Sequence, residues 1–383
     1  MTRYRRFLMF LPLVVLLASC TGIPAYRVEG ELAGQRVGTT VDSEAAKYYL
    51  ENYLAGDRSH PRYAPVIASA LEAWDRYPLD AGTLRGLAGD FSPDFATIYF
   101  ISRIYGEPCN RRAHQLFRNY QTTLRGGGTS RIAPPDPRPT RYLFAFVPGF
   151  AYRREPAIGA DFARQRRLMM AAGFKTFLIE TDEVGTVERN AAFIADELVR
   201  LGREHDEIIL VSTSKGGAEA ALALGKLLKP GQAAKVKAWV SVGGLLRGTP
   251  IADRALRWPR SWWTRVLFFF LGLPAESIES LGTKRRGETF RQLTFPGHML
   301  LVQYVGVPLS GQVSPLARDR YEALRSAGPN DGLTLLPDEL VPGGVVITDI
   351  GLDHYYRDPE IDLKSLALAN AVLDLLDEEE RCR

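Results

Sequence analysis

The sequence predicts an α/β protein in which a mostly parallel β-sheet is flanked by helices. Two observations favour this class: the chain is long, at 383 residues, and after residue 140 short apolar runs alternate with amphipathic stretches. The expected strands are residues 142–148, 175–180, 207–212, 236–242, 299–307 and 344–350. The expected helices between and after them are residues 160–172, 186–204, 215–228 and 361–377.

The region before this alternation has a different pattern. From Asp42 to Leu124, apolar residues recur at steps of three and four, as in DSEAAKYYLENYLAG, which predicts helices. A passage rich in Gly and Pro follows, RGGGTS and then IAPPDPRPT. We therefore expect a helical N-terminal region at 20–130, a linker at 131–140 and an α/β domain at 141–383.

The first 19 residues have the layout of a secretory signal: a basic start, an apolar run and small residues before Cys20. The ending Leu-Ala-Ser-Cys resembles the lipobox of bacterial lipoproteins, which implies that Cys20 receives the lipid and becomes the mature N-terminus. Thr21 follows, and the lack of Asp at that position resembles lipoproteins sorted to an outer membrane. An ordinary signal peptide that happens to precede a cysteine is the alternative.

Charge and cysteine content exclude several classes of protein. The formal net charge is +4, and removal of the signal with its three arginines would leave +1, so no nucleic-acid partner is expected. Apart from Cys20, only Cys109 and Cys382 remain. This number fits neither a disulfide scaffold nor a metal framework, although one bridge is possible in an oxidising compartment.

The stretch EIILVSTSKGGAEAALAL predicts a buried strand, a sharp turn and a helix, with Ser214 at the turn. A nucleophile elbow needs small residues two positions either side of the serine, and Ser212 and Gly216 stand there. The pattern is thus SxSxG, a departure from GxSxG. The alternative is a strand, turn and helix in which Ser214 only caps the helix.

Two further residues follow predicted strands in an order that suggests a triad. Asp331 lies in PNDGLT, after strand 299–307, and His354 lies in GLDHYY, after strand 344–350. The order Ser, Asp, His and the passage GGLLRGTPIAD at 243–253 resemble lipases and esterases of the α/β-hydrolase family, from about Tyr142 to the C-terminus. The resemblance implies the α/β-hydrolase fold and a serine hydrolase that needs no metal or organic cofactor.

Each residue of the predicted site has a chemical role. Ser214 needs a base within hydrogen-bond reach, and His354 is that base. Asp331 would fix the tautomer of His354 and stabilise the imidazolium. Asp349 and Asp353 are nearby alternatives, but the first lies inside a strand and the second is adjacent to the histidine.

The predicted site also needs two backbone N–H donors for the oxyanion of the tetrahedral intermediate. One is expected from Lys215, the residue after the nucleophile. The other is expected from Phe150, in the loop FVPGFAY after the first strand of the α/β domain. Pro148-Gly149 stands where relatives have His-Gly, which matters little because the donor is backbone.

Residues 254–296 are longer than an ordinary crossover and predict an insertion. This segment is rich in aromatic and basic residues, among them Trp258, Trp262, Trp263 and Phe268 to Phe270. It is expected to be a buried cap helix, or a lid that shapes an apolar acyl pocket or enters the lipid interface. The two interpretations are compatible.

Together these features predict a lipid-anchored ester hydrolase of the bacterial cell envelope. Its expected partners are a small-molecule or lipid ester substrate and a membrane, reached through Cys20 and the aromatic insertion. A thioesterase or an acyltransferase would use the same triad. A binding lipoprotein on a catalytically inactive hydrolase scaffold is the alternative from another class, and the SxSxG departure motivates it.

Overall fold

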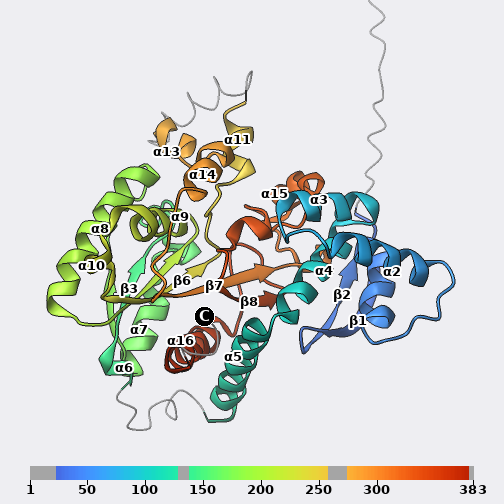
Figure 1. Ribbon diagram of the computed structural model, residues 1–383, viewed down its shortest axis with the longest axis horizontal. Helices are drawn as coiled ribbons and strands as arrows, with labels where there is room; N and C mark the ends of the chain where they lie inside the picture. The colour runs from blue at the N-terminus through green and yellow to red at the C-terminus, as the bar shows by residue number, and fades with distance from the viewer. Residues whose placement is uncertain (1–22, 128–137, 258–273, 379–383) are drawn as a thin grey trace, which may run out of the picture.

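The computed structural model describes residues 23–127, 138–257 and 274–378. Its centre is a sheet of six parallel strands in the order β4-β3-β5-β6-β7-β8 (Figure 1). All six predicted strands are confirmed, with ends within two residues of the expected ones. They are β3 (Leu143–Val147), β4 (Lys175–Leu178), β5 (Ile208–Thr213), β6 (Val236–Val242), β7 (Leu300–Val307) and β8 (Val345–Ile350).

Helices cover both faces of this sheet. Along β3, Leu143, Ala145 and Val147 face one apolar cluster, and Phe144 and Phe146 face another, because successive side chains of a strand point to opposite faces. The first cluster lies under α8 (Val187–Glu204), α9 (Lys215–Leu222) and α10 (Pro230–Ala233). The second lies under α5 (Pro108–Gly127), α7 (Ala163–Ala171) and α16 (Ile361–Asp377). This arrangement confirms the predicted α/β class.

We expected a helical N-terminal region, but this region is not helical throughout. An antiparallel hairpin precedes the helices, formed by β1 (Tyr26–Leu32) and β2 (Gln35–Val41). Ala33 and Gly34 both have positive φ at its turn, 51° and 70°, the conformation that two-residue hairpin turns require. The alternation in VEGEL and VGTTV, where Val28, Leu32, Val37 and Val41 are buried, was the signal that the sequence interpretation passed over.

The predicted helices of this region are present and join the core of the sheet. They are α1 (Glu44–Tyr48), α2 (Tyr63–Trp74), α3 (Ala81–Asp90) and α4 (Pro93–Gly106). Ser43, Asp80 and Ser92 cap α1, α3 and α4, their side chains accepting bonds from the first turns. Their apolar residues form one cluster with residues of β7 and β8, on the right in Figure 1. The region is therefore packed against the β8 side of the sheet.

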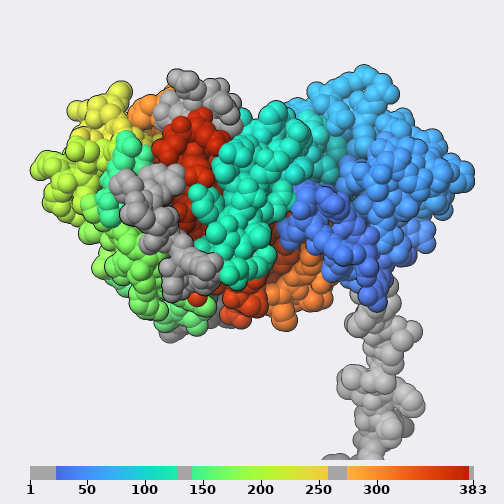
Figure 2. All heavy atoms as spheres, turned by 90° about the horizontal axis from the view of Figure 1, so that it is seen from below, coloured from blue at the N-terminus to red at the C-terminus, as the bar shows by residue number. Residues whose placement is uncertain are grey.

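Helix α5 connects the N-terminal region to the sheet. It runs beside α16, and in Figure 2 its teal surface crosses between the red C-terminal helix and the blue N-terminal part. His114 of α5 is buried, and its Nε2 accepts the backbone N–H of Thr348 in β8 at 2.9 Å. Asn110 Oδ1 accepts the N–H of Val346 at 2.7 Å. These bonds occupy backbone groups at the outer edge of β8.

The remaining short helices lie in the segments before and between the strands of the sheet. The predicted insertion contains α13 (Ala275–Glu279) and α14 (Thr283–Phe290), preceded by α11 (Pro250–Ala255). Its aromatic stretch, Trp258 to Phe270, lies outside the described residues, as do Cys20, Cys382 and most of the predicted linker. Two further short helices are α6 (Arg138–Arg141) and α15 (Arg318–Leu324).

Cys109 at the start of α5 is disulfide-bonded, and both other cysteines of the chain lie outside the described ranges. In the described ranges, none of the helices has the length and apolarity needed to cross a membrane.

The contact between α5 and β8 predicts a pH dependence of stability. Burial lowers the pKa of His114 from its usual 6.5 to about 4. The unfolded chain therefore binds a proton between these values that the folded chain excludes, so stability rises with pH across this window. We expect His114→Ala to lower the free energy of unfolding by about 3 kcal/mol at pH 8. At pH 5 this loss should be smaller by about 2 kcal/mol.

Urea unfolding of wild type and variant at both pH values measures this difference. His205→Ala, which alters a partly exposed histidine at the end of α8, is the control. Its difference from wild type in free energy of unfolding should not shrink between pH 8 and pH 5. If His114→Ala lowers the free energy of unfolding by the same amount at pH 8 and pH 5, the His114 imidazole is not held neutral by burial.

Candidate active site

Ser214 lies at the sharp turn between β5 and α9, near the centre of the sheet. Its φ is 54° and its ψ is −123°, a conformation that residues other than glycine rarely adopt. The turn is held by Ser214 N–H, which donates to Val242 O at 3.2 Å, and by Leu245 N–H, which donates to Ser214 O at 3.0 Å. The strand therefore ends by directing the serine side chain out of the C-terminal edge of the sheet.

Small residues make this turn possible. A Cβ added to Gly216 would lie 2.4 Å from Pro148 O, and one added to Gly217 would lie 2.7 Å from Gly244 Cα. Both obstacles are backbone atoms that cannot move cheaply, so the elbow needs glycine at both positions. Ser212, at the position where the motif departs from glycine, is fully buried and its Oγ accepts Trp239 Nε1–H at 2.8 Å. The departure is thus accommodated by a polar partner in β6.

The structure brings Ser214, His354 and Asp331 together from three distant parts of the chain. His354 Nε2 lies 3.0 Å from Ser214 Oγ, and His354 Nδ1 lies 2.5 Å from Asp331 Oδ2. The side chains of His354 and Asp331 are only 6% and 1% exposed. The backbone N–H of His354 also donates to Asp331 O at 2.9 Å, which fixes one loop against the other.

The other acids near His354 are engaged elsewhere. Asp353 accepts the backbone N–H groups of Ser314 at 2.9 Å and Tyr355 at 3.1 Å. Asp349 contacts Lys364 Nζ and accepts the Tyr304 hydroxyl. Asp331 is therefore the carboxylate that lies against the His354 ring, as the order of residues along the chain had suggested.

Lys215 and Phe150, the two expected backbone donors, flank Ser214. Lys215 begins α9 directly after the serine. The loop that carries Phe150 is fixed on both sides, because Gly149 N–H donates to Ala160 O at 2.9 Å and Ala151 N–H donates to Glu183 O at 3.1 Å. Phe150 itself lines the cavity next to Ser214. No described residue accepts a hydrogen bond from the N–H of Lys215 or Phe150.

The side chain of Lys215 has a role that sequence reasoning missed. It is 2% exposed, and its Nζ pairs with Glu219 one turn along α9. Asn190 of α8 donates to the same Glu219 oxygen at 2.7 Å. Burial raises the pKa of Glu219 to about 7 against the opposing effect of Lys215. Since a buried charge needs a partner, this pair holds the first turn of α9 against α8.

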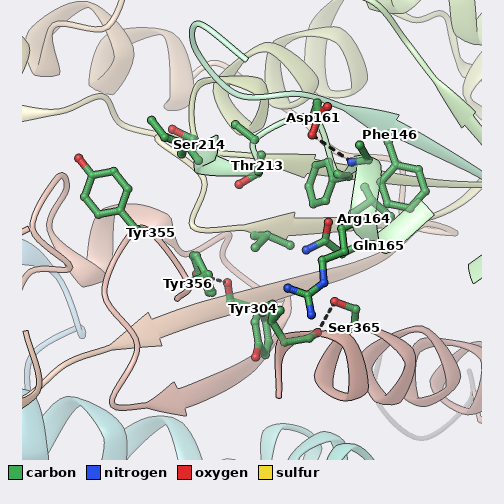
Figure 3. Close-up of a pocket in the computed structure, with 18 of the residues that line it drawn as sticks. Phe146, Asp161, Arg164, Gln165, Thr213, Ser214, Tyr304, Tyr355, Tyr356 and Ser365 are labelled. Atoms are coloured by element: carbon green, nitrogen blue, oxygen red, sulfur yellow. Dashed lines mark hydrogen bonds between the residues drawn. The ribbon is translucent and has the colours of Figure 1, made fainter. Parts of the chain in front are cut away.

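A large apolar cavity opens beside Ser214. Its volume is about 1210 Å³, and it lies between the α7 and α16 helices and the face of the sheet that bears Phe144 and Phe146. Val211, Val240, Met169, Leu368 and Val372 contribute further apolar wall. In Figure 3, Ser214 and Thr213 lie at one side of the cavity and Ser365 of α16 at the other.

The insertion reaches the cavity through Ile278 of α13. Ile251 of α11, just before the insertion, also lines the cavity. Helix α13 is fixed to the body of the molecule, because Ser277 Oγ donates to Gly185 O at 3.1 Å and Ser280 Oγ accepts Val187 N–H at 3.1 Å. Among the described residues, no group of three His, Cys, Asp or Glu side chains could hold a metal ion.

Comparison with known proteins shows the fold. No family model matches this chain, and no curated protein matches it. The metagenomic carboxyl esterase MGS0156 is 21% identical, with a TM-score of 0.54 over 69% of this chain and 91% of the esterase. The mature form of the Bacillus licheniformis lipase BlEst2 is 20% identical, with a TM-score of 0.49 over 63% of this chain and 94% of the lipase. The chain has the α/β-hydrolase fold, as predicted.

Proposed function

We propose that this protein is a serine hydrolase that cleaves carboxylic esters through an acyl-enzyme. The observation that carries the proposal is the continuous chain of contacts from Ser214 Oγ through His354 to Asp331, next to an apolar cavity. His354 Nε2 takes the hydroxyl proton as Ser214 Oγ attacks the ester carbonyl, and it later gives this proton to the leaving alcohol. Water then repeats the sequence on the acyl-enzyme, which releases the acid.

Charge on the substrate oxygen is stabilised by fixed backbone donors. We assign the N–H groups of Lys215 and Phe150 to this role. The buried pair between Lys215 and Glu219 supports it, because it holds the helix start in place while charge develops. Donors that are already oriented need no rearrangement during the reaction, which is why one such donor typically contributes a factor of about 100 to 1000 to the rate.

The cavity supports an apolar acyl group as the part of the substrate that is bound. Its volume of about 1210 Å³ exceeds the range of roughly 300–1000 Å³ usual for small-ligand sites. Phe144, Phe146 and Val240 on the sheet face Leu368 and Val372 on α16 across it. An acyl chain bound there would bury apolar surface at about 25 cal/mol per Å². We therefore favour esters of long fatty acids.

We also propose that the protein is attached to a membrane through lipid on Cys20, and that the aromatic insertion lies close to the lipid surface. The signal layout and the lipobox-like ending support the first part. Tryptophan and arginine side chains in the insertion support the second. A membrane-bound hydrolase would meet lipid esters where they are concentrated.

Covalent labelling with a fluorophosphonate tests the serine mechanism. We expect wild type to incorporate one label and Ser214→Ala to incorporate none, because the reagent reacts with an activated serine hydroxyl. Ser212→Ala is the matched control and should keep most of the labelling. Hydrolysis of p-nitrophenyl esters should disappear in the same Ser214 variant. Folded wild-type protein that neither labels nor hydrolyses would indicate an inactive scaffold instead.

Replacing a cavity residue tests the acyl assignment. Leu368→Trp fills part of the α16 wall, so kcat/KM should fall by about tenfold for long-chain p-nitrophenyl esters and little for acetate. Leu227→Trp is the control, because Leu227 is 41% exposed and does not line the cavity. An equal loss for short and long chains would argue against an acyl chain in this cavity.

The lipid anchor can be tested in a bacterial host that processes lipoproteins. Wild type should incorporate labelled palmitate and sediment with outer membranes, whereas Cys20→Ala should incorporate none. Ser19→Ala preserves a small residue before the cysteine and should behave as wild type. Wild type that is secreted without label would contradict the anchor while leaving the hydrolase proposal intact.

A further inference from the structure

A second buried acid lies beside the Asp331 carboxylate. Glu339 ends the 3-10 turn Leu336–Glu339, eight residues after Asp331, and it is 1% exposed. Neither of its carboxyl oxygens receives a hydrogen bond from a donor among the described residues. Its carboxyl group lies within hydrogen-bond reach of the side chain of Asp331. Two carboxyl groups in contact can form a hydrogen bond only if one of them carries a proton.

The contacts of Asp331 decide which acid carries that proton. Its Oδ1 accepts the backbone N–H groups of Leu333 at 2.8 Å and Thr334 at 2.7 Å. Its Oδ2 lies 2.5 Å from His354 Nδ1. Three donors stabilise the ionised form of a carboxylate, whereas a carboxyl without donors is stable in an apolar site only when neutral. The proton therefore belongs to Glu339.

Among the described residues, no cation compensates a charge on Glu339. The ionisable groups that face it are Asp331, Asp338 and the Tyr356 phenol. Arg247 is close to the same turn, but its Nη1 donates to the carbonyl oxygens of Pro337, Asp338 and Leu340 at 3.2, 3.3 and 2.8 Å. Burial, and next the Asp331 charge, raise the pKa of Glu339 well above its ordinary value.

We propose that Glu339 is a neutral carboxylic acid that donates a hydrogen bond to Asp331 and so positions the triad acid against His354. This inference rests on the proposed hydrolase function. Glu339 is a positioning residue, since it acts through Asp331 and touches no reacting atom. Its hydrogen bond adds a fourth donor to the Asp331 carboxylate, which restricts rotation of that carboxylate away from the imidazole. Because Glu339 is neutral, one negative charge, and not two, faces the imidazolium.

Infrared spectroscopy tests the protonation state without reference to activity. At pH 7.5 the wild-type spectrum should contain a carboxylic acid C=O band that Glu339→Gln removes. Glu288→Gln, which changes an exposed glutamate on α14, is the matched control and should leave the band unchanged. A Glu339→Gln spectrum that loses carboxylate bands, and no carboxylic acid band, would show that Glu339 is ionised and would overturn the proposal.

The pH profile of fluorophosphonate labelling tests the positioning role. Glu339→Gln replaces a neutral donor by a neutral donor, so the acidic limb of the rate should stay in place and the rate should change by no more than about threefold. Glu339→Leu removes the donor and should slow labelling by about tenfold in protein that is still folded by circular dichroism. Rescue by glutamine but not by leucine separates positioning from packing.

Two results would contradict this role. If the acidic limb of Glu339→Gln moves to lower pH by about one unit, the wild-type residue supplies a negative charge beside the imidazolium. If folded Glu339→Leu labels as fast as wild type, the hydrogen bond does not position Asp331. Absence of labelling in wild type itself would refute the hydrolase proposal, and the infrared band would still report the state of Glu339.

Discussion

The site depends on one constraint, the backbone conformation of Ser214 at the end of β5. A positive φ of 54° at this residue turns the chain from strand to helix within one position. The same turn exposes the serine side chain at the sheet edge and makes Lys215 N–H the first donor of α9. Such a conformation costs about 1–3 kcal/mol and persists only where neighbours enforce it. Here the enforcing contacts are the glycines at 216 and 217 and the bonds to β6 and its following loop.

Parallel strands explain why the other residues of the site meet this turn. The carboxyl ends of β5, β7 and β8 lie along the same edge of the sheet, so the loops after them converge although Ser214 and His354 are 140 residues apart. The N-terminal region also fixes the loop after β7 through hydrogen bonds. Asp94 at the start of α4 accepts Ser310 N–H at 2.9 Å, and burial beside Asp42 raises the pKa of Asp94 to about 7. Ser314 in turn donates to Asp353, the neighbour of His354, at 2.9 Å.

Much of this could be predicted from the sequence because the signals were local. Buried parallel strands appear as continuous apolar runs, and the elbow is a contiguous string around Ser214. The order of Asp331 and His354 along the chain was informative because each follows a strand. The hairpin at Tyr26–Val41 was missed because glycines interrupt its alternation, with Gly30 between Val28 and Leu32 and Gly38 next to Val37. Glu339 and the Lys215–Glu219 pair gave no sequence signal, since their meaning depends on burial and on partners that only the folded chain brings together.

The cavity between the sheet and α16 results from the way in which helices cover the sheet. A sheet face that bears Phe144, Phe146 and Val240 must be covered, and α7 and α16 cover it while leaving a gap of about 1210 Å³ next to Ser214. A gap of this size lined by apolar side chains forgoes dispersion contacts that close packing would supply. If Ser214 acts as proposed, an apolar ligand that binds in this gap would restore those contacts. The strained turn at Ser214 and the incomplete packing next to it therefore both favour the proposed substrate, an ester whose acyl chain completes the core.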